Sequence, residues 1–450
     1  MTIDAKLNER IERVFALQRA TRVARKAEGA VQRIARLEKL KDVIIRSIPD
    51  IEQAMYQDLR KAPNGGKSGE IPAVLEEIEI AKKNLEAWMA PHPVETSPHF
   101  EGNATYIQYE PRGVVLLLGA WNFPFALVMS PLVPIIAAGN SAMIKPNELQ
   151  PATSQVIAGI VDEIFDEQDV AVFEGGVEVA ERLQQLPFDH VFFTGSPNVG
   201  KLVMAAAAKH LSTVTLELGG KCPVIVDEGY DLVDAAGKAA GARFNNAGQL
   251  CLSVDHAWVP KAKVQEFCGI VGAVIDKMFY VDGEFQPERL PHIVNERNFD
   301  RVIGYIEEAV SRGATIVKGG ASDRETLTIE PIILVDVPLD AKIMEEEIFG
   351  PVLPVLGYED LSEVLTNVDE NGKPLAMYIF SKDQAFVDKV LEGTSSGGVT
   401  VNHVIMHYLE TNLPFGGVNG SGMGRYHAFA GFQELSNARS MFIAGGSVSG

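Results

Sequence analysis

The sequence alternates short β-rich strings with helical patterns over most of its length, and this alternation limits the folds that the chain can adopt. Between residues 113 and 220, helical patterns begin near Pro124, Pro151, Val177 and Pro197, and the strings GVVLLLG, SAMIKP, VAVFEGG, HVFFTGS and TVTLELGG stand between them. Strands and helices that alternate in this way are typical of βαβ units in a parallel, doubly wound sheet. We therefore predict an α/β fold.

The alternation continues after Lys221 and predicts a second α/β lobe. CPVIVD and AWVP have the composition of strands, and helical patterns cover about 231–245 and 261–278. Further strands and helices follow as far as VTVN. A chain of 450 residues with 46% hydrophobic residues is large enough for two or three packed lobes.

The two ends of the chain have other patterns. Up to about Trp88, apolar residues recur at spacings of three and four, which predicts amphipathic helices. The stretch 91–111, with TYIQYEP between polar and proline-rich segments, predicts an extended excursion or hairpin. The C-terminal LPFGGVNGSGMGRYHAFAGF is a glycine-rich loop, and the short tail after it could pair with another subunit.

Charge and cysteine content exclude several classes of protein. The formal net charge of -20 would repel phosphate backbones and anionic lipid, so neither nucleic acid nor a membrane surface is an expected partner. The three cysteines form no CxxC pair and no zinc-like Cys/His spacing, so we expect no disulfide framework and no metal site. The opening MTIDAKLNERIER has no apolar core of a secretory signal, and we expect a cytoplasmic protein.

The uncharged stretch from Gly113 to Ile144 is long enough to suggest a membrane span. Its prolines and polar residues instead divide it into a strand, a turn, a helix and a second strand of a globular core. The residues that divide it are Asn122, Pro124, Pro131, Pro134 and Asn140. We expect no membrane anchor.

Cys251, in FNNAGQLCLS, is a candidate nucleophile. Small neighbours follow a helical segment there and would leave its sulfur approachable. A buried structural thiol is the alternative, and it is the commoner fate of a lone cysteine. A nucleophilic cysteine needs a base and an oxyanion donor nearby, and the chain offers candidates for both at strand ends.

Glu217 and Asn122 are those candidates. Glu217 ends the apolar string TVTLE, where a carboxylate is either a surface residue or a base desolvated at the carboxyl edge of the sheet. Asn122 lies at a strand-to-helix junction, where its amide either donates to an oxyanion or caps the helix. The local pattern does not decide between these alternatives.

Two glycine-rich strings could hold phosphate. TGSPNVGK, at 194–201, follows a strand and opens a helix, which suits phosphate oxygens, but it lacks the order GxGxxG. NGGKS, at 64–68, resembles a phosphate loop. However, Lys61 stands where that motif requires glycine, and no apolar strand precedes it. We therefore discard NGGKS.

The order and spacing of seven motifs resemble the aldehyde dehydrogenase superfamily. The motifs are WNFP, KPNE, FTGS, ELGGK, GQLC, EEIFGP and LPFGG. The resemblance covers about 75–429 and is greatest to the class 3 branch, which includes fatty, aromatic, benzaldehyde and coniferyl aldehyde dehydrogenases. It implies that Cys251 is the nucleophile and Glu217 the general base. The Asn122 side chain and the Cys251 N–H would then form the oxyanion hole.

The resemblance also implies NAD as cofactor, with NADP as a second candidate. Lys145 and Glu148 would hold the adenosine ribose, and the glycine turn near residue 195 would lie beneath the pyrophosphate. Glu347 and Phe349 would position the nicotinamide ribose and ring. The full expected cofactor set is Trp121, Lys145, Glu148, Gly195, Ser196, Gly200, Leu218, Glu347 and Phe349.

For the fold, the resemblance implies a Rossmann-like, doubly wound cofactor domain, an α/β catalytic domain and a small β oligomerisation arm in a homodimer. We assign residues 1–96 and 114–219 to the cofactor domain and 220–419 to the catalytic domain. The arm and tail are 97–113 and 420–450.

Three positions depart from the family pattern. Leu250 precedes the cysteine where threonine is usual, His403 stands where class 3 members often have aspartate, and VNGSG reverses the usual Gly-Asn order. His403 either borders the substrate funnel or hydrogen-bonds locally, and the second reading is the commoner one.

The implied reaction oxidises an aromatic or medium- to long-chain aliphatic aldehyde to its acid. It proceeds through a thiohemiacetal and a thioester on Cys251, and water activated by Glu217 hydrolyses the thioester. Two rivals remain. A CoA-acylating dehydrogenase would pass the acyl group to CoA instead of water, and a non-catalytic binding protein could use the same fold.

Overall fold

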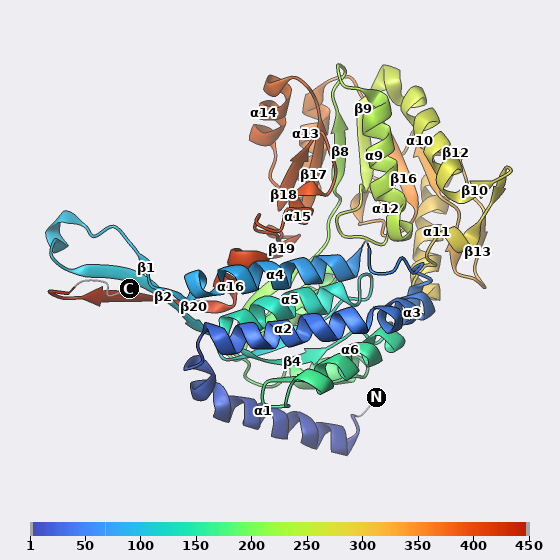
Figure 1. The fold of residues 1–450 in the computed structure, drawn as a ribbon. Helices are drawn as coiled ribbons and strands as arrows, with labels where there is room; N and C mark the ends of the chain where they lie inside the picture. The colour runs from blue at the N-terminus through green and yellow to red at the C-terminus, as the bar shows by residue number, and fades with distance from the viewer. Residues whose placement is uncertain (1–2, 68, 447–450) are drawn as a thin grey trace.

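The computed structural model describes residues 3–67 and 69–446, which form two lobes and a projecting arm (Figure 1). Residues 447–450 of the expected tail and Ser68 of the discarded NGGKS string lie outside the described residues. The N-terminal part is helical, as predicted. Its helices are α1 (Ala5–Lys26), α2 (Ala30–Arg46), α3 (Ile48–Leu59) and α4 (Glu70–Met89).

A six-stranded sheet lies at the centre of the first lobe, in the order β19-β7-β6-β3-β4-β5. All neighbouring pairs from β7 to β5 are parallel, and only β19 is antiparallel to its neighbour. The predicted doubly wound sheet is therefore confirmed. The strands are β3 (Val114–Leu118), β4 (Ser141–Lys145), β5 (Val170–Val172), β6 (His190–Thr194), β7 (Thr213–Glu217) and β19 (Gly422–Met423).

Helices cover both faces of this sheet, and alternate residues of β3 show why. Val115 and Leu117 are buried in one apolar cluster with α2, α4 and α5, which lie side by side in Figure 1. Val114 and Leu116 are buried in a second cluster with α1, on the opposite face. Strands buried on both faces are continuous hydrophobic runs. The remaining helices of the lobe are α5 (Ala126–Ala138), α6 (Pro151–Ile164), α7 (Val177–Leu183) and α8 (Pro197–Ala208).

The apolar stretch 113–144 forms the predicted strand, turn, helix and strand, with one difference. Pro131 and Pro134 do not divide it but lie inside α5, all of whose residues are buried. Proline removes a backbone donor from a helix interior. Tight packing against α2 and α4 holds α5 despite this loss. Among residues 3–67 and 69–446, no helix has the length and apolar character needed to cross a membrane.

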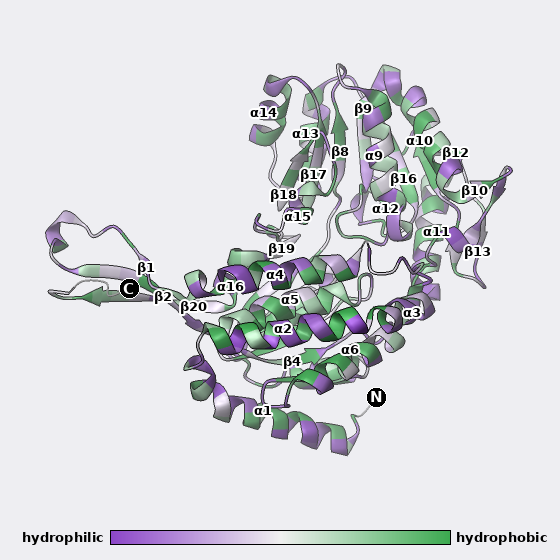
Figure 2. Ribbon diagram, viewed as in Figure 1, coloured by the Kyte–Doolittle hydropathy of each residue, from purple (hydrophilic) through white to green (hydrophobic). Residues whose placement is uncertain are grey.

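The second lobe contains a seven-stranded sheet in the order β12-β15-β16-β9-β8-β17-β18, parallel except for β12. Figure 2 shows β8 as hydrophobic and the outer helix α14 as mixed. The strands are β8 (Pro223–Val226), β9 (His256–Pro260), β12 (Thr315–Lys318), β15 (Ile332–Val335), β16 (Val352–Tyr358), β17 (Ala376–Phe380) and β18 (Gly398–Val401). The longer helices are α9 (Leu232–Phe244), α10 (Val264–Phe279), α11 (Glu296–Ser311), α13 (Leu361–Glu370) and α14 (Gln384–Gly393).

Short elements complete this lobe. They are η2 (Asn245–Gly248), η3 (Lys261–Lys263), η4 (Pro287–Arg289), β10 (Tyr280–Val281), β11 (Glu284–Phe285), β13 (Ser322–Asp323), β14 (Thr328–Ile329), α12 (Lys342–Glu345) and α15 (Met406–Leu409).

The projecting arm is an antiparallel ribbon that joins distant parts of the chain. β2 (Ala104–Pro111) pairs with β1 (His92–Pro93) on one side and with β20 (Ser436–Ile443) on the other. The short η1 (Pro98–Phe100) lies in the turn between β1 and β2. The predicted excursion at 91–111 is thus confirmed. α16 (Ala428–Glu434) precedes β20 and packs on α4 and α5 of the first lobe.

Candidate active site

A cavity of about 1530 Å³ contains nearly all of the predicted site residues. It opens where β3, β4, β6 and β7 end, at the carboxyl edge of the first sheet, which is where open α/β sheets bind ligands. The second lobe supplies its other wall. Of the predicted residues, those that line it are Trp121, Asn122, Lys145, Glu148, Gly195, Ser196, Glu217, Leu218, Cys251, Glu347 and Phe349.

Gly200 is the predicted residue that does not line the cavity. It lies in the first turns of α8, where a Cβ would come within 2.8 Å of Leu218 Cδ2. A glycine there lets the helix approach the chain just after β7. The residue therefore shapes the cavity from behind.

Cys251 lies on the loop after η2, and its side chain is half-buried at the cavity wall. The other cysteines, Cys222 and Cys268, are buried and do not line the cavity. Burial raises the pKa of the Cys251 thiol, and the nearby carboxylates of Glu347 and Glu217 raise it further. Without ligands, the site therefore favours the neutral thiol.

Glu217 is the last residue of β7 and is only 3% exposed, which excludes the surface alternative. Among the described residues, neither of its carboxylate oxygens has a hydrogen-bond partner. Burial raises the pKa of Glu217 well above its ordinary value, while Arg425 lowers this pKa and Glu434 raises it. A buried carboxyl with free oxygens beside the cavity is suited to accept a proton from a bound water.

Asn122 does not cap the helix that follows it. α5 begins four residues later, and its first amides are bound by the carboxylate of Glu70. The Asn122 side chain is buried at the cavity and donates through Nδ2 to the carbonyl of Gln249 at 3.2 Å. This contact turns the amide toward the loop that carries Cys251. The second N–H of the amide remains a potential donor to an oxyanion.

The ends of β4 and β6 form the expected cofactor side. Lys145 ends β4 and makes an ion pair with Glu148. Gly195 separates β6 from α8, and Ser196 caps α8, with its hydroxyl accepting from the Val199 N–H at 3.4 Å. A helix N-terminus that faces a cavity presents amide donors to phosphate oxygens. These features fit a dinucleotide.

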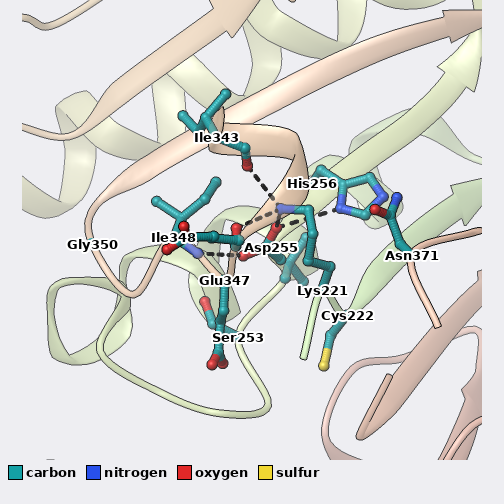
Figure 3. A network of polar contacts seen from close by, with 12 residues as sticks. Lys221, Cys222, Ser253, Asp255, His256, Ile343, Glu347, Ile348, Gly350 and Asn371 are labelled. Atoms are coloured by element: carbon teal, nitrogen blue, oxygen red, sulfur yellow. Dashed lines mark hydrogen bonds and ion pairs between the residues drawn. The ribbon is translucent and has the colours of Figure 1, made fainter. Parts of the chain in front are cut away.

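Glu347 and Phe349 stand on a loop of the second lobe that is fixed by a buried network (Figure 3). Lys221 forms an ion pair with Asp255 and donates to the carbonyls of Ile343 and Glu346, at 2.8 and 3.0 Å. Asp255 in turn accepts from the Ile348 N–H at 3.0 Å. The ion pair thus bonds to a carbonyl of α12 and to a carbonyl and an N–H group of the loop that follows it.

Two further cations hold the same loop. Arg243 donates to the carbonyl of Gly350 at 2.6 Å, and Arg301 donates to that of Ile348 at 2.9 Å. Burial and the neighbouring Asp255 raise the pKa of Glu347 to about 8.

The two lobes also meet through aromatic rings. The rings of Trp121 and Phe349 lie edge to face with centroids 5.3 Å apart. Since Trp121 follows β3 of the first lobe and Phe349 belongs to the second, this contact closes the site between them.

Sequence reasoning missed the residues that support the site. Lys221 belongs to the ELGGK motif, which is a signal that could have identified it. Asp255, Arg243 and Arg301 have no local motif, and they meet only in the folded chain.

The departures from the family pattern lie in different surroundings. The Nδ1 atom of His403 accepts from the Val404 N–H at 2.9 Å, and His403 does not line the cavity, which agrees with the local interpretation. Asn419 and Gly420 of VNGSG do line it. Leu250 packs against the core beside Cys251.

Comparisons with known proteins give a consistent picture. A model described as "Aldehyde dehydrogenase family" matches residues 2–441. The chain is 39% identical to "Aldehyde dehydrogenase, dimeric NADP-preferring" of Canis lupus familiaris, over 91% of the chain and 89% of that protein. It is 39% identical to "Aldehyde dehydrogenase family 3 member A2" of Macaca fascicularis, over 90% and 83%. The solved structure "Substrate bound state of Staphylococcus Aureus AldH" superposes with a TM-score of 0.91 at 38% identity and covers 96% of this chain and 94% of that one.

Proposed function

Because the chain belongs to the aldehyde dehydrogenase family, in a class 3-like branch, we propose that Cys251, Glu217 and Asn122 carry out its reaction. The protein is an oxidoreductase that acts on aldehydes and uses NAD or NADP. The observation that carries the proposal is the buried Glu217, whose two oxygens have no hydrogen-bond partner among the described residues and share one cavity with the half-buried thiol of Cys251.

In the first half of the proposed reaction, Cys251 loses its proton to solvent and its sulfur bonds to the aldehyde carbon. The aldehyde oxygen becomes an oxyanion that accepts hydrogen bonds from the Asn122 side chain and the Cys251 N–H. Each such donor is worth roughly 3 kcal/mol at comparable acyl-transfer sites. The bound nicotinamide supplies the acceptor for the hydride that leaves this carbon, so a thioester remains on Cys251.

In the second half, Glu217 takes a proton from a water that attacks the thioester carbonyl. The carbon–sulfur bond breaks, the acid leaves and the Cys251 thiolate regains a proton from Glu217. Glu217 can accept the proton of the water only while its carboxyl group is ionised. The raised pKa makes Glu217 a stronger base in its ionised form, while its burial keeps other waters away.

The cofactor would lie between the end of β4, the N-terminus of α8 and the Glu347 loop. We propose that NAD is bound at least as well as NADP, since the carboxylate of Glu148 would repel a 2'-phosphate. Lys145 neutralises part of that charge through its ion pair with Glu148. The canine relative, by its name, prefers NADP, so this preference needs its own test.

Assembly, domains and location are also proposals. We infer that the β2–β20 ribbon is an oligomerisation arm of a homodimer, since Phe442 on β20 and Phe100 in the adjoining turn are about half exposed. On the same basis we propose three domains. They are a cofactor domain of residues 1–96 and 114–219, a catalytic domain of residues 220–419, and an arm with its tail of residues 97–113 and 420–450. From the sequence, we propose a cytoplasmic location.

In the decisive experiment, the rate of cofactor reduction is measured by absorbance and the product is identified chemically. The enzyme receives an aromatic or an aliphatic aldehyde, with and without CoA. The carboxylic acid should form at the same rate in both cases. A CoA thioester as product would favour the acylating alternative, and no cofactor reduction with any aldehyde would favour a binding protein. Comparison of kcat/KM for benzaldehyde, coniferyl aldehyde, hexanal and decanal then defines the preferred substrate.

A further inference from the structure

Lys61, in the loop between α3 and α4, contacts the part of the chain that carries Asn122. Its Nζ donates to the backbone carbonyl of Asn122 at 2.6 Å and to Oε1 of Glu70 at 2.7 Å. The same ammonium lies 4.0 Å from the centroid of the Phe123 ring. The side chain of Lys61 is only 14% exposed. The largely buried ammonium group thus contacts two successive residues of the WNFP motif, Asn122 and Phe123.

Glu70 holds the other end of this segment. Its Oε2 accepts from the N–H groups of Phe125 and Ala126, each at 2.9 Å. The N-cap residue of α5, Phe125, has no side chain that could do so. A carboxylate at this place binds amides that the helix leaves unpaired and complements the positive end of the helix dipole.

Lys61 and Glu70 therefore hold residues 122–126 from both ends through one ion pair. Burial lowers the pKa of Lys61, and the charge of Glu70 opposes this effect. Removing one partner of a buried pair leaves the other uncompensated, which costs more than the loss of an exposed pair. A carboxylate of Glu70 without its cation would also place a negative charge on the segment that has to stabilise an oxyanion.

The second lobe also holds Asn122 by hydrogen bonds. Asn246 donates through Nδ2 to the carbonyls of Asn122 and Gln249, each at 3.0 Å. Gln249 accepts from the Asn122 amide and lies two residues before Cys251. The position of Asn122 relative to Cys251 thus depends on contacts from both lobes, and Lys61 supplies the shortest one to the Asn122 carbonyl.

We propose that Lys61 and Glu70 are positioning residues for the oxyanion hole, a role that rests on the proposed function of Asn122. They fix the orientation of the Asn122 amide. Their opposite charges also neutralise each other, so that no net charge stands beside this amide. Neither residue lines the cavity, so neither touches a substrate there.

The test compares Lys61→Met with Asn122→Ala and with the double variant. Removal of an oxyanion donor lowers kcat by about 10²–10³-fold, and a misplaced donor should lose about 10-fold or more. We expect Lys61→Met to lower kcat in this way with little change in KM. Because Lys61 acts through Asn122, the double variant should lose little more than Asn122→Ala alone.

Two readouts separate positioning from general damage. Cofactor affinity and the alkylation rate of Cys251 do not use the oxyanion hole, so both should stay within about twofold in Lys61→Met. The matched control is Lys41→Met, which removes a more exposed pair with Glu79, at 2.8 Å, between α2 and α4 of the same lobe. It should leave kcat unchanged. Lys61→Arg keeps a cationic donor and should recover part of the lost rate.

Several outcomes would overturn the proposal. An unchanged kcat in Lys61→Met is one, and losses that multiply in the double variant are another. If Lys61→Met does not fold, Glu70→Gln gives the same comparison, because it removes the charge of the partner of Lys61 and keeps the size of the side chain. If Asn122→Ala itself is fully active, the proposed function of Asn122 fails, and that result is distinct from a failure of Lys61.

Discussion

The thiol of Cys222 donates a hydrogen bond to the backbone carbonyl of Cys251 at 3.3 Å. The same sulfur accepts from the Ala376 N–H, also at 3.3 Å. Two of the three cysteines thus lie against each other, yet only Cys251 reaches the cavity. Cys222 is buried and both of its hydrogen bonds go to the backbone, so this neighbour is a structural thiol.

This difference predicts the result of cysteine substitution. Cys251→Ala should abolish aldehyde oxidation, whereas Cys222→Ala and Cys268→Ala should retain most of it. Cys222→Ser is the matched control because it keeps a donor to the Cys251 carbonyl. Iodoacetamide labelling with peptide mapping should find Cys251 modified first. Rapid labelling of Cys222 or Cys268 with an inert Cys251 would refute the assignment of the nucleophile.

Glu347→Gln should make Cys251 more reactive in the absence of cofactor. Glu347 is the largest charged contribution to the raised pKa of the thiol. Since the pKa of Glu347 is about 8, its charge is present mainly above that pH, and there the variant should alkylate faster than the parent. Below pH 7 the two rates should converge. Glu345→Gln, an exposed neighbour, is the control, and a variant no faster at pH 9 would contradict the prediction.

Glu217→Gln should separate the two halves of the reaction. The first hydride transfer does not need the base for hydrolysis, so stopped flow should show a burst of up to one reduced cofactor per site. Turnover should then stall, with a thioester adduct visible by intact mass. If Glu217 also deprotonates Cys251, the burst slows and recovers as pH approaches the free thiol pKa of about 8.5. A steady-state kcat within about threefold of the parent, less than about 1 kcal/mol of barrier, would exclude Glu217 as the base.

Arg425→Met should move the acid limb of the kcat profile to higher pH. Hydrolysis needs the ionised carboxylate, and its pKa is raised by burial and Glu434 but lowered by Arg425. Removing the cation takes away the lowering contribution, so more alkaline conditions are needed to ionise Glu217. Arg425→Lys keeps the charge and should shift the limb less. Arg439→Met, on the exposed arm, should not shift it, and an unmoved limb in Arg425→Met would show that Arg425 does not tune the base.

Glu148→Gln should improve the use of NADP relative to NAD. The carboxylate is expected to repel a 2'-phosphate, and glutamine keeps its size without its charge. Titration of both cofactors against parent and variant measures the effect as a ratio of dissociation constants. No change in that ratio would mean that another residue discriminates between the cofactors.

The parts of the site that sequence could predict are those that stand at strand ends. Glu217 ends an apolar string, and Gly195 separates a strand from a helix, so the local pattern places both at the carboxyl edge of one sheet. Chain order alone also predicts the alternation of strands and helices. Pro131 and Pro134 show the limit of local rules, because packing on both sides of α5 retains them within a helix.

The supporting residues could not be predicted because their partners are distant in sequence. Lys61 meets Asn122 from another part of the first lobe, and its loop was discarded as a failed phosphate motif. Arg243 and Arg301 reach one loop from α9 and α11. No spacing rule connects such positions, since only the tertiary fold brings a donor and its carbonyl together.

The pairing of β19 with β7 has a consequence for how the enzyme is made. Glu217 lies beside Gly422 in this antiparallel pair, and β2 finds its partner in β20. A ribosome adding roughly 5–20 residues per second synthesises Glu217 and Cys251 well before β19 and β20. An unfinished chain therefore carries the nucleophile without a completed wall around its base. Catalytic competence is therefore expected only after β19 and β20 have been added, and loss of these two strands is expected to disable the enzyme even though every reacting group is still present.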